Sequence, residues 1–125
     1  MRKYICLLTF AVICLMTVAC NRVSGNPRED ADKMADELIE VAHDYDAKKV
    51  DKIVGKYVKY YENAPLRDRV KFIRRFRDNK KLEDNSAFER MTEKESFKEC
   101  PAVEDMDELF KTTRKEAVEA DIWNE

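Results

Sequence analysis

The stretch that decides the fold is 46-DAKKVDKIVGKYVKYYEN-63. Its apolar residues recur at intervals of three and four, and they are Val50, Ile53, Val54, Tyr57, Val58 and Tyr61. An α-helix turns once in about 3.6 residues, so this spacing places all six side chains on one face. Asp46 is suited to cap the N-terminus of such a helix. The stretch therefore predicts an amphipathic helix that buries one side against the rest of the protein.

A second helical pattern precedes this stretch, from about Arg28 to Asp44. Its apolar stripe consists of Ala31, Met34, Ala35, Leu38, Val41, Ala42 and Tyr45. Acidic residues in its first turns complement the positive end of the helix dipole, and these are Glu29, Asp30 and Asp32. The segment Asp44-Tyr45-Asp46 predicts a tight corner, because aspartate side chains compete for backbone donors. One continuous helix is the alternative.

Three further patterns follow the deciding stretch. A helix is predicted from Pro65 to about Asn79, with Phe72 at the edge of a stripe of Leu66, Val70, Ile73 and Phe76. Residues 82–100 show a ragged stripe with Ser86 as a candidate cap, and its members are Leu82, Phe88, Met91 and Phe97. A last helix is predicted from about Val103, with the stripe Val103, Met106, Leu109, Phe110, Thr113 and Ala117, followed by Ile122 and Trp123.

The prolines fall between these patterns. Pro27, Pro65 and Pro101 each stand where a helix would begin, a position at which the missing N–H has no cost. No segment shows the alternation of a half-buried strand. The sequence therefore predicts an all-α protein, a small bundle of four or five helices in a single domain over residues 27–125. Connections of a few residues favour antiparallel neighbours.

The first twenty residues, 1-MRKYICLLTFAVICLMTVAC-20, have a different composition. Arg2 and Lys3 precede sixteen uncharged residues, and Ala19 is the small residue that a signal peptidase requires. The segment resembles a bacterial lipoprotein precursor, whose lipobox ends in a small residue and then the cysteine that becomes lipidated. The resemblance implies a signal peptide over residues 1–19 and lipidation of Cys20. It also implies a bacterial cell-envelope location, with the outer membrane favoured because Asn21 is not an aspartate.

Two other interpretations of the leader stay open. As an uncleaved anchor, its apolar run would span about 24 Å, less than the ~30 Å core of a bilayer. Cleavage after Ala19 without lipidation would release a soluble secreted protein. Residues 20–26 are polar and contain Gly25, so they predict a flexible tether.

The cysteines agree with export. Cys6 and Cys14 lie in the leader and Cys20 would be lipidated, which leaves Cys100 as the remaining thiol. No intramolecular disulfide is then available in the mature chain. Cys100 is predicted to be a buried structural cysteine, and an intermolecular disulfide is the alternative.

Residue types that carry catalysis or bind metals are scarce. The single histidine, His43, lies beside Asp44, and this pair is typical of a general base or of a simple helix-dipole partner. An acidic group at the start of the last helix is suited either to weak calcium binding or to that helix dipole, and it consists of Glu104, Asp105, Asp107 and Glu108. We therefore expect no catalytic residues, no metal site and no cofactor.

Charge segregation is the strongest feature of the mature chain. The segment 67-RDRVKFIRRFRDNKK-81 carries eight bases and two acids, whereas residues 82–125 carry fourteen acids and six bases. The two regions neutralise each other within the fold, or the basic helix meets anionic headgroups, or a charged face meets an oppositely charged protein. The candidate interaction surface consists of Arg67, Arg69, Lys71, Arg74, Arg75, Arg77, Lys80 and Lys81, with Tyr60, which lies off the apolar face of its helix.

Two further expectations concern the aromatic residues. Phe72 and Phe76 lie on the apolar stripe, and the chain is exported and net acidic, so nucleic-acid binding is not expected. Trp123 either closes the core or marks an interface.

The sequence as a whole predicts a membrane-anchored, non-enzymatic interaction module of the cell envelope that binds a protein or an anionic envelope component. The alternatives are a small envelope enzyme that uses carboxylates and an inhibitor or immunity-type lipoprotein. The oligomeric state is not indicated by any feature of the sequence.

Overall fold

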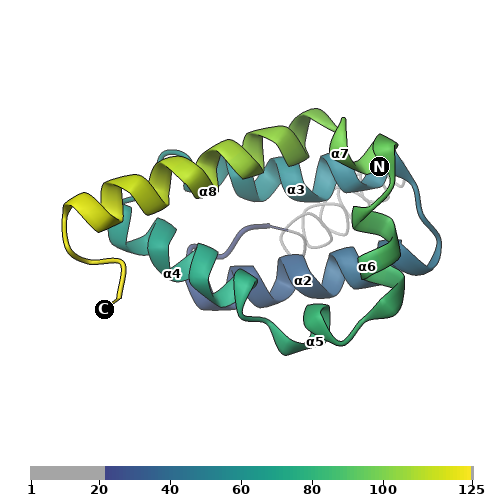
Figure 1. Ribbon diagram of the computed structural model, residues 1–125, viewed down its shortest axis with the longest axis horizontal. Coiled ribbons are helices and arrows are strands. Elements are labelled where there is room, and N and C mark those ends of the chain that lie inside the picture. The colour runs from purple at the N-terminus through teal and green to yellow at the C-terminus, as the bar shows by residue number, and fades with distance from the viewer. Residues whose placement is uncertain (1–21, 125) are drawn as a thin grey trace, which may run out of the picture.

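The computed structural model describes residues 22–124 and shows an all-α protein (Figure 1). Its four long helices are α2 (Pro27–His43), α3 (Ala47–Tyr61), α4 (Leu66–Arg77) and α8 (Pro101–Glu119). Three short helices connect α4 to α8, and they are α5 (Lys80–Glu83), α6 (Ser86–Thr92) and α7 (Glu95–Lys98). No strand occurs in residues 22–124. The predicted all-α fold is confirmed.

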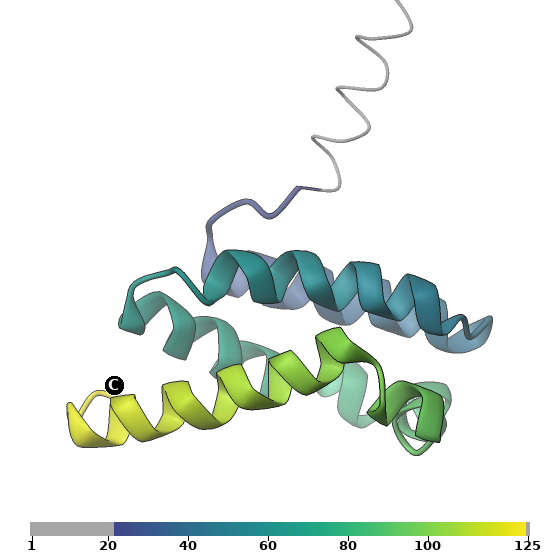
Figure 2. The same ribbon diagram turned by 90° about the horizontal axis from the view of Figure 1, so that it is seen from above.

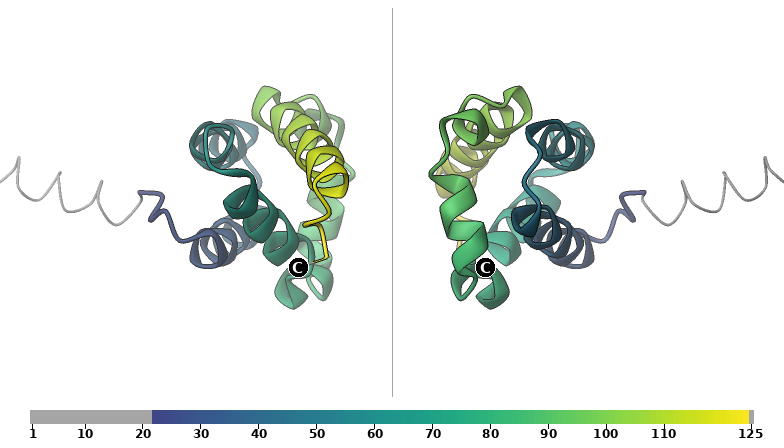
Figure 3. Two further views of the ribbon diagram at one scale, coloured as in Figure 1. Left: turned by 90° about the vertical axis from the view of Figure 1, so that its left-hand side faces the viewer. Right: turned by 90° about the vertical axis from the view of Figure 1, so that its right-hand side faces the viewer.

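The long helices form a ring around a common core. Both α2 and α8 pack against α3 and α4, so α3 and α4 stand opposite each other, as the end-on views of Figure 3 show. Aromatic rings fill the space between α3 and α4. The rings of Tyr61 and Phe72 stack with their centroids 4.1 Å apart, and Tyr57 lies 6.2 Å from Phe72. The placement of Phe72 at the edge of a stripe was wrong, because α4 is covered from both sides and Phe72 is fully buried.

The helix boundaries follow from local chemistry. The corner at residues 44–46 is confirmed, and an Asp46 carboxylate oxygen accepts a hydrogen bond from Lys48 N at 2.9 Å. Pro27 and Pro101 occupy the first turns of their helices, as predicted. The cap of α6 is Asn85 and not Ser86. Asn85 has the extended backbone that an N-cap requires, and its side chain accepts a hydrogen bond from Phe88 N at 2.9 Å.

A buried carboxylate holds the segment that enters α2. Asp30 is fully buried. One of its oxygens accepts hydrogen bonds from the N–H and the hydroxyl of Ser24, both at 2.8 Å, and the other accepts from Gly25 N at 3.0 Å. The hydroxyl of Tyr61 also donates to this carboxylate. We call these four residues the Asp30 clasp.

The clasp changes two sequence-based interpretations. Asp30 was predicted to complement the helix dipole, but its main role is to bind the chain that precedes α2. The predicted flexible tether over residues 20–26 is anchored from Ser24 onward, and Val23 packs against the core. Cys20 and the leader lie outside the described residues.

Gly25 and Tyr60 fit closely together beside the clasp. Gly25 has φ = +88°, a conformation that favours glycine. A Cβ atom at this position would come within 2.8 Å of the Tyr60 hydroxyl oxygen, so any other residue would also displace the end of the Tyr60 side chain. The rings of Tyr60 and Tyr61 form an edge-to-face pair with their centroids 4.9 Å apart, and Tyr60 stays 44% exposed.

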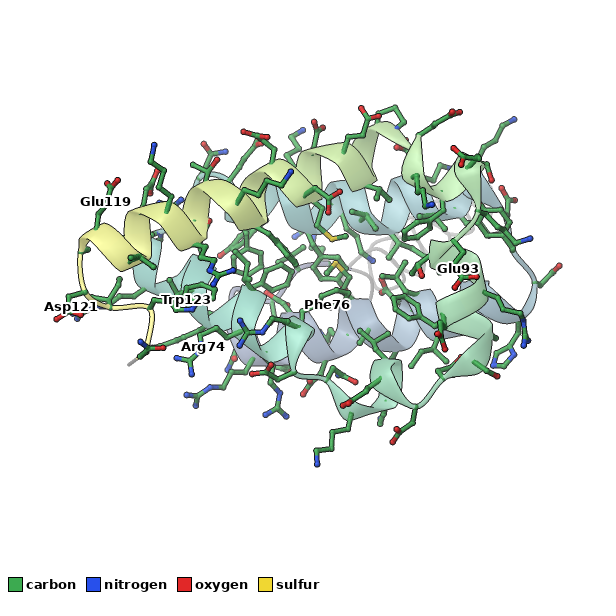
Figure 4. The ribbon with its side chains drawn as sticks, viewed as in Figure 1. Arg74, Phe76, Glu93, Glu119, Asp121 and Trp123 are labelled. Atoms are coloured by element: carbon green, nitrogen blue, oxygen red, sulfur yellow. The ribbon has the colours of Figure 1, made fainter. Side chains whose placement is uncertain are left out.

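The C-terminal turn folds the chain back over α4. Asp121 adopts the left-handed backbone conformation, with φ = +56°, and Ile122 N donates to Ala117 O at 2.9 Å. These two features form a Schellman-type helix end. The guanidinium groups of Arg77 and Arg114 both lie over the Trp123 ring, 5.5 and 5.8 Å from its centroid. Figure 4 shows this turn beyond the end of α8. Trp123 packs against the core, which agrees with the first of the two predictions for this residue.

Cys100 joins the start of α8 to α3. Its thiol is buried and donates to an Asp51 carboxylate oxygen at 3.3 Å, and the same oxygen accepts from Ala102 N at 3.1 Å. Burial raises the pKa of the thiol, and the hydrogen bond to Asp51 raises it further. The prediction of a buried structural cysteine is confirmed.

Candidate functional site

A positively charged groove lies between α2 and α4. Its volume is about 830 Å³. The lining residues are Arg28, Asp32, Asp36, Arg67, Val70, Lys71, Arg74, Arg75, Asp78, Asn79, Lys80, Lys81 and Ile122. Seven cations therefore face three carboxylates, which leaves an excess of four positive charges. We call this hollow the basic groove.

The sequence builds this groove through the helical repeat of α4. Arg67, Lys71, Arg74 and Arg75 are spaced by three and four residues, so they project from one side of the helix. Phe72 and Phe76 occupy the buried side. The short helix α5 follows directly and adds two lysines to the same groove, and the C-terminal turn adds Ile122.

The carboxylates of α2 hold some of these cations in place. The guanidinium of Arg75 binds both carboxylate oxygens of Asp32 at 3.0 Å, and this hydrogen bonding raises the pKa of Arg75. Lys81 Nζ lies 3.4 Å from an Asp36 oxygen. The two parallel hydrogen bonds to Asp32 fix the orientation of the planar Arg75 guanidinium against α2. These ion pairs do not cancel the positive excess of the groove.

Asp78, Lys71 and Lys80 are three further charged residues of the groove. The hydrogen bond from Arg77 holds the pKa of Asp78 below its ordinary value, so this carboxylate stays ionised. Lys71 and Lys80 are exposed, and the side chain of neither makes a hydrogen bond or an ion pair with another described residue. These two lysines are therefore available to a ligand.

Neutralisation between the basic helix and the acidic C-terminal half is visible at one flank of α4. Arg69 on α4 forms an ion pair with Glu116 on α8 at 3.0 Å. The ion pairs that line the groove instead connect α4 and α5 to α2. The charge segregation seen in the sequence thus persists as a basic surface on one side of the ring.

The structure brings together six of the nine predicted surface residues in the basic groove, and these are Arg67, Lys71, Arg74, Arg75, Lys80 and Lys81. The prediction that Arg69 belongs to this exposed surface was wrong. Its side chain is 15% exposed, binds Ala64 O at 3.1 Å and pairs with Glu116, so it ties the α3–α4 loop to α8. Arg69 lies on the flank of α4 that faces α8, and the sequence alone does not show where α8 packs.

Arg77 and Tyr60 also lie outside the groove. Arg77 covers the Trp123 ring and pairs with Asp78 at 3.0 Å, and Tyr60 lies beside the Asp30 clasp. Arg28 is a lining residue that the sequence interpretation missed, because it belongs to α2 and not to the basic run. Its spacing of four from Asp32 was the available signal, since this places both on one side of α2.

A second hollow, of about 590 Å³, lies between α2 and α3. Its lining is Glu37, Glu40, Val41, Asp44, Lys49, Lys52, Ile53 and Lys56. Lys56 pairs with Glu37 at 2.9 Å, while the other Glu37 oxygen is buried without a hydrogen-bond partner among the described residues. Burial raises the pKa of the neighbouring Tyr57, and the charge of Glu37 raises it further. Three acids from the α2 side face three lysines from α3, so the lining has no net charge that would select a charged ligand.

The other sequence candidates are dispersed. His43 is exposed at the end of α2 and lines neither of the two hollows. The acidic residues at the start of α8 are exposed, and residues 22–124 contain no group of three or more His, Cys, Asp or Glu side chains placed to hold a metal ion. None of the described helices is long and apolar enough to cross a membrane.

Comparisons of the chain with protein-family models, curated proteins and solved structures find no match. Function is therefore inferred from the chemistry of the basic groove. Arginine forks and lysine ammonium groups bind carboxylates and phosphates, and the lining contains no serine, cysteine or histidine nucleophile. The groove is suited to binding an anion.

Proposed function

We propose that this chain is a membrane-anchored, non-enzymatic binding module of the bacterial cell envelope whose basic groove holds an anionic partner. The observation that carries the proposal is the set of seven cations around one hollow between α2 and α4. The groove volume of 830 Å³ lies within the range of about 300–1,000 Å³ that is common for ligand sites.

The anchor in this proposal is Cys20. The resemblance of residues 1–20 to a lipoprotein leader supports cleavage before Cys20 and lipidation of its thiol. Buried acyl chains contribute about 0.8 kcal/mol per methylene, so two or three chains hold a protein on a bilayer stably. An anchored groove meets its partner at the envelope surface, and Asn21 favours the outer membrane.

The partner is expected to carry several negative charges close together. The side chains of Lys71 and Lys80 lack partners among the described residues, and Arg75 already presents a fixed guanidinium plane. Charge complementarity of this kind accelerates association and makes it sensitive to salt. Binding should therefore weaken as the ionic strength rises.

A pair of triple variants tests the groove. Lys71→Glu, Arg75→Glu and Lys81→Glu reverse three exposed cations of the groove, whereas Lys48→Glu, Lys49→Glu and Lys52→Glu reverse three exposed cations of α3. Both variants change the net charge equally. Photo-crosslinking from position 80 in intact cells should recover a partner from the wild type and the α3 variant. The groove variant should recover at least about tenfold less of that partner, which corresponds to a loss of about 1.4 kcal/mol of binding free energy.

Two outcomes would contradict the proposal. Equal loss in both triple variants would show that overall charge, and not the groove, determines recovery. Absence of any specific partner together with absence of binding to anionic lipid vesicles would remove the binding function. The anchor is tested separately by the intact mass of the membrane-extracted protein, since a chain that starts at Met1 or carries an unmodified Cys20 contradicts lipidation.

A further inference from the structure

The Asp30 clasp determines the side from which the chain leaves the bundle. Ser24 and Gly25 are bound to Asp30, and Val23 packs against the core. The segment from residue 22 to residue 26 lies on the outer side of the α2–α3 pair, away from α8 (Figure 2). A chain held in this way cannot turn freely around the domain.

The remaining distance to the anchor is short. Four peptide units separate Cys20 from Ser24, and a fully extended chain of that length spans at most about 14 Å. A lipid attached to Cys20 would therefore bring the outer side of α2 and α3 to the membrane surface. The opposite side, formed by α8, would point away from the bilayer.

The surface beside the clasp has the chemistry of a membrane interface. Tyr60 is one of two large apolar side chains that are markedly exposed among the described residues, and its ring is fixed against Gly25 and Tyr61. Tyrosine is enriched at the headgroup level of bilayers, because its ring is apolar and its hydroxyl is polar. Arg22 is exposed two residues before Ser24 of the clasp, and Lys59 and Glu62 are exposed close to Tyr60 in the sequence. The two cations attract anionic headgroups, and Glu62 opposes them.

We propose that the outer side of the α2–α3 pair around Tyr60 is a membrane-contact surface, with the Tyr60 ring in the headgroup region of an anionic bilayer. This inference rests on the proposed lipidation of Cys20. The basic groove then opens on the neighbouring side of the helix bundle, between α2 and α4, and stays accessible to a partner.

Tryptophan quenching by brominated lipids measures this orientation. The background variant Trp123→Phe removes the native tryptophan, and Tyr60→Trp or Val118→Trp then supplies a single probe. Val118 is the matched control, because it is the other exposed large apolar residue, at 58%, and it lies on α8. In vesicles of phosphatidylglycerol and brominated phosphatidylcholine, the probe at position 60 should be quenched several-fold more strongly than the probe at position 118.

The outcomes separate the inference from the proposed function. Intact mass is measured first, and an unlipidated Cys20 overturns the anchor itself. A lipidated protein whose two probes are quenched equally keeps its anchor and overturns the orientation. Asp30→Asn should release the segment before α2 and reduce the difference between the two probes, with the helical circular dichroism as a check on folding.

A second measurement needs no substitution near the clasp. Lys59 and Lys111 are both exposed and lie on α3 and α8. In wild-type protein anchored in anionic vesicles, acylation of Lys59 should be slower than that of Lys111, and the ratio should approach the detergent value when the vesicles are dissolved. An unchanged ratio would contradict membrane contact at this surface.

Discussion

Asp30 and Asp32 stand two residues apart on α2 and have the same side chain, yet they lie in opposite environments. Asp30 is fully buried and accepts hydrogen bonds from Ser24, Gly25 and Tyr61. Asp32 is partly exposed on the other flank of the helix, where it pairs with Arg75 in the basic groove. Two residues along an α-helix rotate the side chain by about 200°, which accounts for the difference.

The comparison separates stability from recognition. Hydrogen bonds to a buried charge stabilise a fold strongly, and a buried donor that loses its acceptor is costly. An exposed ion pair contributes about 0–1 kcal/mol. The clasp side of α2 therefore contributes mainly to the stability of the fold, whereas the groove side presents charged groups that are suited to binding a ligand.

The largest effect is expected from Phe72→Ala on the clasp side. The Phe72 ring stacks on Tyr61, which donates to Asp30, so its removal leaves a cavity beneath the clasp. The free energy of unfolding should fall by about 3–5 kcal/mol, as measured by urea denaturation. The half-buried Phe88 is the control, and Phe88→Ala should cost less than half as much. Equal losses would show that the stacked Phe72 ring contributes no more to stability than the half-buried Phe88 ring.

The two aspartates themselves give the next largest difference. Asp30→Ala should lower the free energy of unfolding by about 3 kcal/mol, because the N–H groups of Ser24 and Gly25 and the Tyr61 hydroxyl lose a charged acceptor. Asp32→Ala should cost less than about 1 kcal/mol. In a binding assay with inorganic polyphosphate the order should reverse, with tighter binding by Asp32→Ala and no change for Asp30→Ala. Similar losses of stability from both substitutions would contradict the conclusion that Asp30 stabilises the fold more than Asp32.

Alkaline pH should weaken the clasp side selectively. Burial raises the pKa of Tyr61 above its ordinary value of 10.0, and the hydrogen bond to Asp30 raises it further. Burial likewise raises the pKa of Tyr57. Their stabilisation is complete below pH 10 and is lost as the pH rises above it, because the unfolded chain then releases protons that the folded chain keeps. Urea denaturation on both sides of pH 10 measures this loss, and Tyr57→Phe should make it shallower.

The smallest expected effect is a gain on the groove side. Asp121 adopts φ = +56° in the turn that brings Ile122 to the groove, and glycine adopts this conformation without strain. Asp121→Gly should raise the free energy of unfolding by about 0.5 kcal/mol. Thermal unfolding detects this change, with Asp121→Ala as the control that should give no gain. A lower melting temperature for Asp121→Gly would show that the Asp121 side chain itself stabilises the turn.

The sequence predicts the long helices well, because their signals are local. The three- and four-residue spacing on α3, the prolines at the starts of α2 and α8, and the corner at Asp46 all act within a few residues. The burial of Asp30 is not local. Its carboxylate is satisfied by Tyr61, which lies 31 positions away and reaches it only after α3 has packed on α2.

Part of the basic groove was predictable, because the spacing of its α4 cations is also a local signal. Its α4 cations share one side of a helix, and this follows from their spacing alone. Arg69 and Phe72 were misplaced because their positions depend on α8 and α3, which cover the other sides of α4. Arg28 was missed because α2 contributes it from a distant part of the chain.

The C-terminal turn has a practical consequence for labelling the protein. Ile122 lines the basic groove, and two arginines lie over the Trp123 ring, so a tag joined directly after Asn124 would begin close to the groove. An acidic epitope there would compete with the anionic ligand and imitate a loss of binding. Glu93, between α6 and α7, is exposed at the opposite end of the molecule (Figure 4). An internal tag at that turn would leave both the groove and the proposed membrane-contact surface uncovered.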